Sequence, residues 1–84
     1  MKIEIDENTI KQALELLDIQ RKHCFDSGCE LIVKQLYQTS RKGNQKQLSY
    51  YNGHVNALEY LFQLSNYVLT VDIAGKHHIE KREF

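Results

Sequence analysis

Two stretches of helical periodicity, separated by a polar turn, constrain the fold of this chain more than any other feature of its sequence. In residues 7–40, and again in residues 45–71, apolar side chains recur every three or four positions, which aligns them along one side of an α-helix. The intervening residues 39–44 include two bases, Gly43 and Asn44, which is typical of a helix end followed by a turn. The sequence therefore predicts an antiparallel hairpin of two helices.

The first stretch contains one point where a helix could instead break. Residues 27–30 read Ser-Gly-Cys-Glu, and a serine followed three residues later by glutamate forms a capping box that starts a new helix. Against a break, the apolar stripe resumes in phase at Cys29, Ile32 and Leu36. One continuous helix over residues 7–40 is the favoured interpretation.

The second stretch carries two adjacent apolar seams, and a helix with two seams needs two neighbours. Two helices share a single line of contact and cannot enclose a core, so a single copy leaves one seam in water. Two-fold self-association is the commonest solution and yields a four-helix bundle. We therefore expect an all-α homodimer or higher oligomer, associated through one seam: Leu48, Tyr51, Val55, Leu58 and Phe62.

Small residues are expected to let the two helices approach each other closely. Antiparallel packing around a turn near Gly43 places Gly28 level with Ala57, and Gly53 level with Ile32. A glycine inside a helix lowers its stability by about 1 kcal/mol relative to alanine, and close helix packing is one reason to retain it. The sequence thus predicts a packing role for Gly28, Gly53 and Ala57.

The two ends of the chain have strand-like alternation in place of helical periodicity. Residues 2–6 and residues 70–73 alternate polar and apolar side chains, so we expect them to pair as a short β ribbon. Residues 76–84 are charged and are expected to form a frayed tail. The 84 residues contain no internal repeat and predict a single small domain.

Charge and composition narrow the class of protein. The chain has 11 basic and 11 acidic residues and a formal net charge of zero, which argues against strong general attraction to nucleic acid. No apolar run approaches the roughly 18 residues that span a bilayer, and the start of the chain is acidic, so we expect a soluble cytoplasmic protein. Cys24 and Cys29 lack the ligand spacing of a zinc site and are expected to be free thiols, without a metal or cofactor.

Basic and aromatic residues gather near the predicted turn and form the candidate binding site. Basic groups among aromatic faces can hold phosphates while stacking bases, although lysine and arginine also favour a helix C-terminus for its dipole alone. A protein partner, a small phosphorylated ligand in a pocket between subunits, and a nucleic acid are therefore alternative occupants. The candidate residues are Lys34, Tyr37, Arg41, Lys42, Lys46, Tyr50 and Tyr51.

The motifs of common enzymes are absent from the sequence. It has no Gly-x-Ser-x-Gly elbow, no phosphate-binding Gly-x-x-x-x-Gly-Lys loop and no His-Glu-x-x-His pair, so we expect no catalytic activity. Tyrosines left outside the core are favoured anchors at protein interfaces. The sequence therefore favours a small adaptor or inhibitor that binds another protein. Its lack of proline and many Lys, Gln, Asn, Ile and Tyr residues suit an AT-rich genome, which makes a phage or mobile-element origin one hypothesis.

Overall fold

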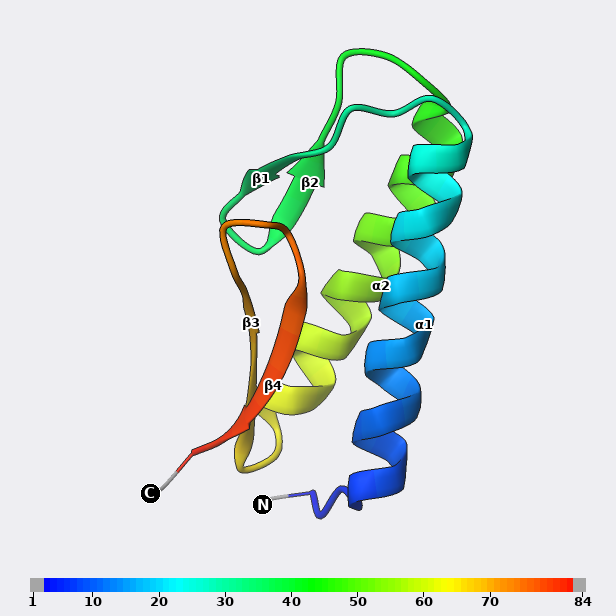
Figure 1. Ribbon diagram of the computed structural model, residues 1–84. Helices are drawn as coiled ribbons and strands as arrows, with labels where there is room; N and C mark the ends of the chain where they lie inside the picture. The colour runs from blue at the N-terminus through cyan, green and yellow to red at the C-terminus, as the bar shows by residue number, and fades with distance from the viewer. Residues whose placement is uncertain (1–2, 83–84) are drawn as a thin grey trace.

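The computed structural model describes residues 3–82, which form two α-helices and two small antiparallel hairpins (Figure 1). The elements in chain order are α1 (Glu7–Asp26), β1 (Ile32–Lys34), β2 (Tyr37–Thr39), α2 (Gln45–Gln63), β3 (Tyr67–Val71) and β4 (His77–Lys81). β1 pairs with β2, and β3 pairs with β4. The architecture is mixed α/β, so the predicted all-α helical bundle is wrong.

Both helices begin where the sequence indicates, because a side chain caps each first turn. The Asp6 carboxylate accepts the backbone N–H of Thr9 at 2.7 Å, just ahead of α1. The Asn44 side chain accepts the backbone N–H of Gln47 at 3.0 Å, just ahead of α2. Each bond satisfies one of the backbone donors that a helix start leaves without an internal partner.

α1 ends after Asp26, and the predicted continuous helix over residues 7–40 is wrong. Gly28 has a φ of +91°, in the left-handed region that glycine adopts without strain. The next backbone N–H, that of Cys29, donates to the Cys24 carbonyl at 3.0 Å and so closes the helix end. The apolar stripe runs on in phase beyond this point, but the glycine-containing cap determines where the helix stops.

Residues 32–39, expected to be helical, fold as a tight antiparallel hairpin in which Ile32 lies opposite Thr39. α2 holds this hairpin through one side chain. Asn52 accepts the backbone N–H of Gln38 at 3.0 Å and donates to the carbonyl of the same residue at 2.8 Å. The Asn52 side chain thus makes the two hydrogen bonds to Gln38 that a neighbouring strand would make at this edge of β2.

α2 ends at Gln63, and the prediction that it continues to residue 71 is wrong. The Ser65 hydroxyl donates to the Phe62 carbonyl at 2.9 Å and accepts the backbone N–H of Tyr67 at 3.1 Å, which turns the chain out of the helix. The following residues 67–71 read Tyr-Val-Leu-Thr-Val, a run of β-branched and aromatic side chains that favours a strand.

β3 pairs with β4, which lies in the segment expected to fray. The register places Leu69 opposite Ile79 and Val71 opposite His77, and Gly75, with φ +84°, forms the turn between the strands. The predicted charged tail over residues 76–84 is therefore wrong through Lys81; residues 83–84 lie outside the described residues.

The ribbon expected between residues 2–6 and 70–73 does not form in the described part of the chain. Ile3 instead makes a single parallel bridge with Ser65, and its backbone N–H donates to the Leu64 carbonyl at 2.8 Å. Lys2 lies outside the described residues. β3 takes β4 as its partner because the tight turn at Gly75 brings those two segments together with little loss of chain entropy.

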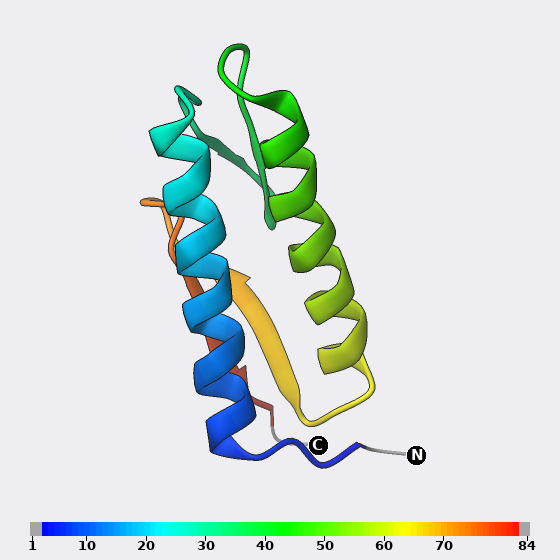
Figure 2. The same ribbon diagram turned by 90° about the vertical axis from the view of Figure 1, so that its right-hand side faces the viewer.

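The helices run antiparallel in one layer, and the two hairpins lie against one face of that layer (Figure 2). β4 packs on α1, while β3 packs on α2. Between the layers lies a core of buried residues, namely Ala13, Leu17, Cys24, Cys29, Leu48, Tyr51, Val55, Phe62 and Leu69.

The hairpins therefore supply the second neighbour that α2 needs. Of the residues expected to join copies of the chain, four are buried in this core and the fifth is half-buried against it: Leu48, Tyr51, Val55, Phe62 and, half-buried, Leu58. This burial within one chain removes the reason given for association through that seam. Self-association itself stays a prediction.

The small residues expected between the helices lie elsewhere. Gly28 follows the end of α1, and Ala57 is exposed on α2. Gly53 is exposed as well, and a side chain built on it would meet nothing within 4 Å. The structure gives none of the three a part in packing α1 against α2.

A buried histidine joins three elements of the fold. His77 on β4 is 3% exposed; its Nδ1 lies 3.2 Å from the hydroxyl of Tyr51 on α2, and its Nε2 lies 3.2 Å from the carbonyl of Leu36, between β1 and β2. A neutral imidazole that donates from Nε2 and accepts at Nδ1 satisfies both bonds. The network therefore fixes the tip of the first hairpin against the second and both against α2.

Replacing Gln38 by methionine is expected to stabilise the protein. Gln38 is 2% exposed, and among the described residues its amide nitrogen and oxygen have no hydrogen-bond partner. Burying an unpaired amide is unfavourable by about 1–3 kcal/mol, so Gln38→Met should raise the free energy of unfolding in urea by an amount within that range. Gln47→Met is the matched control: the Gln47 amide donates to Gln20 at 2.7 Å, and its loss should destabilise. A loss of stability in Gln38→Met would contradict this reading.

Acid is expected to destabilise the fold through His77. Burial lowers the pKa of His77 below its ordinary 6.5, although the bond to Leu36 acts in the opposite direction. The unfolded chain then binds a proton at a pH where the folded chain does not, so stability is fully present above about pH 6.5 and is lost as the pH falls below it. Urea unfolding between about pH 7 and pH 5 should show this loss, and His77→Gln should reduce it.

His23→Gln is the control, because His23 is exposed on α1. This variant should lose stability in acid as the wild type does. An equal pH dependence in wild type and His77→Gln would show that His77 does not carry the effect.

Candidate functional site

The basic and tyrosine residues expected to form one site are dispersed in the structure. Tyr51 is fully buried and hydrogen-bonded to His77, whereas its neighbour Tyr50 is 57% exposed. Lys42 is paired with Glu30 at 2.7 Å on the surface. Lys34, Arg41 and Lys46 are exposed on β1, on the turn before α2 and on the first turn of α2. These side chains therefore do not converge on one pocket around the tyrosines.

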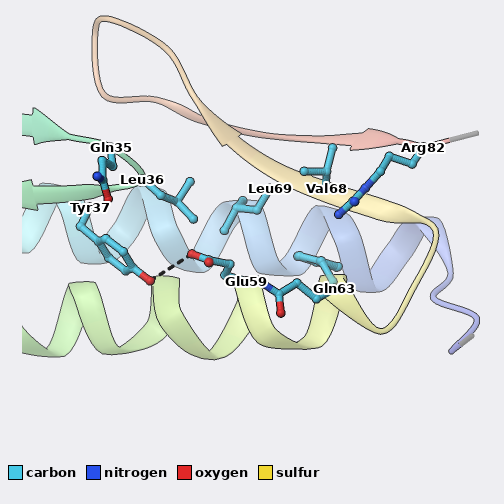
Figure 3. Close-up of a pocket in the computed structure, with 9 residues that line it drawn as sticks. Gln35, Leu36, Tyr37, Glu59, Gln63, Val68, Leu69 and Arg82 are labelled. Atoms are coloured by element: carbon cyan, nitrogen blue, oxygen red, sulfur yellow. Dashed lines mark hydrogen bonds between the residues drawn. The ribbon is translucent and has the colours of Figure 1, made fainter.

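A groove lies where β3, the second half of α2 and the tip of the first hairpin meet. Its volume is about 270 Å³, and Figure 3 shows the Glu59 carboxylate pointing toward the Tyr37 hydroxyl at one end and Arg82 at the other. The side chains that line it combine apolar and polar groups: Gln35, Leu36, Tyr37, Glu59, Phe62, Gln63, Val68, Leu69 and Arg82. Of the residues named from the sequence as binding candidates, Tyr37 is the member that lines this groove.

Tyr37 brings two acceptors together at the rim of the groove. Its hydroxyl lies 3.0 Å from Glu59 Oε2 and 3.2 Å from Asn56 Oδ1. Burial, followed by the hydrogen bond to Glu59, raises the pKa of Tyr37, so the phenol stays protonated at neutral pH. A phenol has a single proton to donate, so the two acceptors share one donor, and the carboxylate keeps capacity for another.

The outer face of α2 carries an apolar stripe that the rest of the chain leaves uncovered. Tyr50 is 57% exposed, Tyr60 67% and Leu64 41%. Gly53 and Ala57, both exposed, lie between them. These five residues, called the α2 stripe below, fall within about 80° of the helix circumference.

The two helices differ sharply in charge on their exposed surfaces. α1 is covered by charged residues, as expected for a solvated helix: Glu7, Lys11, Glu15, Asp18, Arg21, Lys22 and Asp26. α2 is nearly as long, yet its only residues of this kind are Lys46 and Glu59. An exposed helix face that lacks charge and carries large apolar groups is typical of a protein interaction surface.

A second hollow lies on the opposite side of the molecule, beside α1. Its volume is about 330 Å³, and its lining is largely charged: Asp18, Arg21, Lys22, Phe25 and Lys76. The Arg21 guanidinium lies 4.8 Å from the centre of the Phe25 ring and donates to the Ala74 carbonyl at the β3–β4 turn. Arg21 is thus engaged in holding that turn on α1.

The cysteines offer little reactivity. Cys24 and Cys29 are both buried. Burial, with a smaller contribution from Cys29, raises the pKa of the Cys24 thiol to about 11, and a protonated thiol is a poor nucleophile. Within residues 3–82 no group of three His, Cys, Asp or Glu side chains is placed to hold a metal ion, and no helix there is long and apolar enough to cross a membrane.

Comparison with known proteins finds no match to a protein-family model, to a curated protein or to a solved structure.

Of the two surface features, the α2 stripe had a partial signal in the sequence and the groove had none. The scarcity of charge between Gln45 and Gln63 can be counted directly, and it marks the α2 stripe once the core-facing side of the helix is known. The groove had no comparable signal, because it depends on β3 and β4, which form in segments assigned to a helix and a tail.

Proposed function

We propose that this chain is a non-enzymatic protein-interaction module that self-associates through the α2 stripe. The observation that carries the proposal is the exposed, uncharged α2 stripe, with Tyr50, Tyr60 and Leu64 arranged around Gly53 and Ala57; on the same face, Lys46 lies one turn before Tyr50, beyond the end of the stripe. In the cell such a protein acts as an adaptor or inhibitor. A cytoplasmic location, where Cys24 and Cys29 remain reduced, belongs to the same proposal.

The order of residues along the stripe favours a second copy as the occupant. If two α2 helices cross antiparallel with their Ala57 residues in contact, Tyr60 of each copy lies over Gly53 of the other, and Tyr50 lies near Leu64. The large Tyr60 thereby meets the small Gly53 on both sides of the two-fold axis, Tyr50 and Leu64 add apolar contact at the two ends, and the same patch serves both copies. This self-complementarity is the condition for a closed two-fold dimer.

Gly53 supports the proposal because nothing inside the chain requires it. A glycine in a helix interior is less favourable than alanine by about 1 kcal/mol, and Gly53 has no neighbour within 4 Å that a side chain would meet. Close approach of a second helix explains its presence. Burying each tyrosine contributes about 1.5–3 kcal/mol before the entropy of association is subtracted.

The other candidate functions receive less support from the arrangement. Binding of a phosphorylated ligand or of nucleic acid at the turn would need several free bases on one face. Lys42 is paired with Glu30, and of the two adjacent tyrosines that would stack on such a ligand, Tyr51 is buried and only Tyr50 is exposed. A chain with zero net charge also provides no general attraction for a polyanion.

Charge in the middle of the stripe should abolish self-association. At roughly 10 μM, sedimentation equilibrium of the wild type should give twice the 9.9 kDa chain mass, and Ala57→Glu should give the single mass because two carboxylates would meet at the two-fold axis. Gln12→Glu, an exposed site on α1, is the matched control and should leave the dimer intact. A wild type that remains monomeric would contradict the proposal.

Gly53→Ala should have opposite effects on the folding stability of the monomer and on the strength of the dimer. In the Ala57→Glu background the substitution should raise the free energy of unfolding by about 1 kcal/mol, since alanine is the better helix former and has space. In the otherwise wild-type chain it should weaken the dimer by about tenfold, because the added methyl group meets the tyrosine of the second copy. A dimer of unchanged or greater strength would rule out close packing at Gly53.

A further inference from the structure

β3 has one free edge. Within residues 3–82, β3 and β4 form a sheet of two strands, so each has a neighbouring strand on one side alone. The backbone N–H of Asp72 donates to the Lys76 carbonyl, and that of Arg82 donates to the Asn66 carbonyl. Because bonded pairs alternate along an antiparallel ladder, the N–H and C=O groups of Leu69 and Val71 point away from β4.

This free edge lacks the usual protection against pairing with another chain. β4 carries charged and polar side chains, including His78, Glu80 and Lys81, which are typical of a guarded edge. β3 reads Tyr-Val-Leu-Thr-Val and carries no charge. β3 also lies beside the groove, since Val68 and Leu69 form part of the groove lining.

The groove limits which partner can use the edge. α2 lines one side of the groove with Glu59 and Gln63, and β3 lines the other side with Val68 and Leu69 (Figure 3). A partner that adds to β3 at this place lies next to α2, so a single extended segment is a simpler occupant than the edge of a folded sheet. The half-buried side chains of Leu36 and Val68 supply apolar contacts for side chains of that segment.

Two charged side chains line the groove, Glu59 beside Tyr37 and Arg82 at the far end (Figure 3), so only the end at Glu59 favours a basic group. Glu59 and Asn56 share the one proton of the Tyr37 hydroxyl, so the Glu59 carboxylate can accept a further donor. A lysine or arginine side chain of a bound segment supplies both that donor and the opposite charge.

We propose that this groove binds an extended peptide of a partner protein, which adds to β3 as a third strand and places a lysine or arginine against Glu59. The site is separate from the α2 stripe: it uses the side of α2 that faces β3. Backbone hydrogen bonds to Leu69 and Val71 give the complex its register, and the basic side chain gives it selectivity.

The test uses a phage-displayed library of random peptides about ten residues long, twice the five residues of β3, selected on the intact protein. Enriched peptides should contain a lysine or arginine and lack proline in the paired region. Their synthetic forms are then N-methylated one residue at a time and titrated by isothermal calorimetry. Strand addition predicts that affinity falls by about tenfold or more at every second residue, because only alternate N–H groups face β3.

Protein variants locate the site. Val68→Lys places a charge in the groove and should abolish binding, whereas Thr70→Lys, a half-buried position on the same face of β3 that does not line the groove, should leave it nearly unchanged. Glu59→Gln should weaken binding by about fivefold and remove the preference for a basic residue. Circular dichroism confirms that each variant is folded, and the Glu59→Gln result stands even if Val68→Lys does not fold.

Three results would overturn the proposal: no enriched peptide, N-methyl effects without a period of two, or equal binding by wild type and Glu59→Gln. Ala57→Glu distinguishes the two sites, because it should lose the dimer and retain peptide binding. If the wild-type protein forms the dimer but binds no peptide, the groove proposal is refuted and the α2-stripe proposal stands.

Discussion

The cover that β3 and β4 provide over the two helices is the interaction on which the rest of the structure depends. Two helices share one line of contact, and α2 carries too much apolar surface for α1 to hide. The second hairpin closes over them with Leu69 and the buried His77, whose imidazole links α2 to the tip of the first hairpin. The core is therefore completed within one chain, even in a protein of 84 residues.

The way in which β3 and β4 cover the helices determines which surfaces stay exposed and can bind a partner. With its core-facing side buried, α2 exposes an opposite face that is almost free of charge, while α1 is covered by charged side chains in the usual way. The same hairpin leaves an unguarded strand edge beside α2. Both proposed binding surfaces thus follow from the way the β3–β4 sheet lies on the two helices. The α2 stripe is the helix face that the sheet does not cover, and the groove lies along the free edge of β3.

The sequence predicted the helix starts and grouped the apolar seam of α2 correctly, because periodicity is a local signal, but it assigned that seam to a second copy and not to the core of one chain. It failed at the helix ends. The apolar residues of 32–39 keep helical phase, so the break depended on the left-handed Gly28 and on side-chain support from Asn52. β4 was missed because its charged residues resemble a tail until β3 offers a ladder. Of the predicted site, Tyr37 lies in the groove and Tyr50 on the α2 stripe, whereas Tyr51 belongs to the core.

The most direct measurement is an isotope-filtered NOE experiment on a mixture of labelled and unlabelled chains, which separates contacts within a chain from contacts between chains. Tyr51 and His77, whose rings lie 5.8 Å apart, should show NOEs within one chain only. Contacts between chains should connect Tyr60 of one copy with Gly53 of the other. Intermolecular NOEs from Leu48, Val55 or Phe62 would instead show that the core is completed by a second copy, and would contradict closure by β3 and β4.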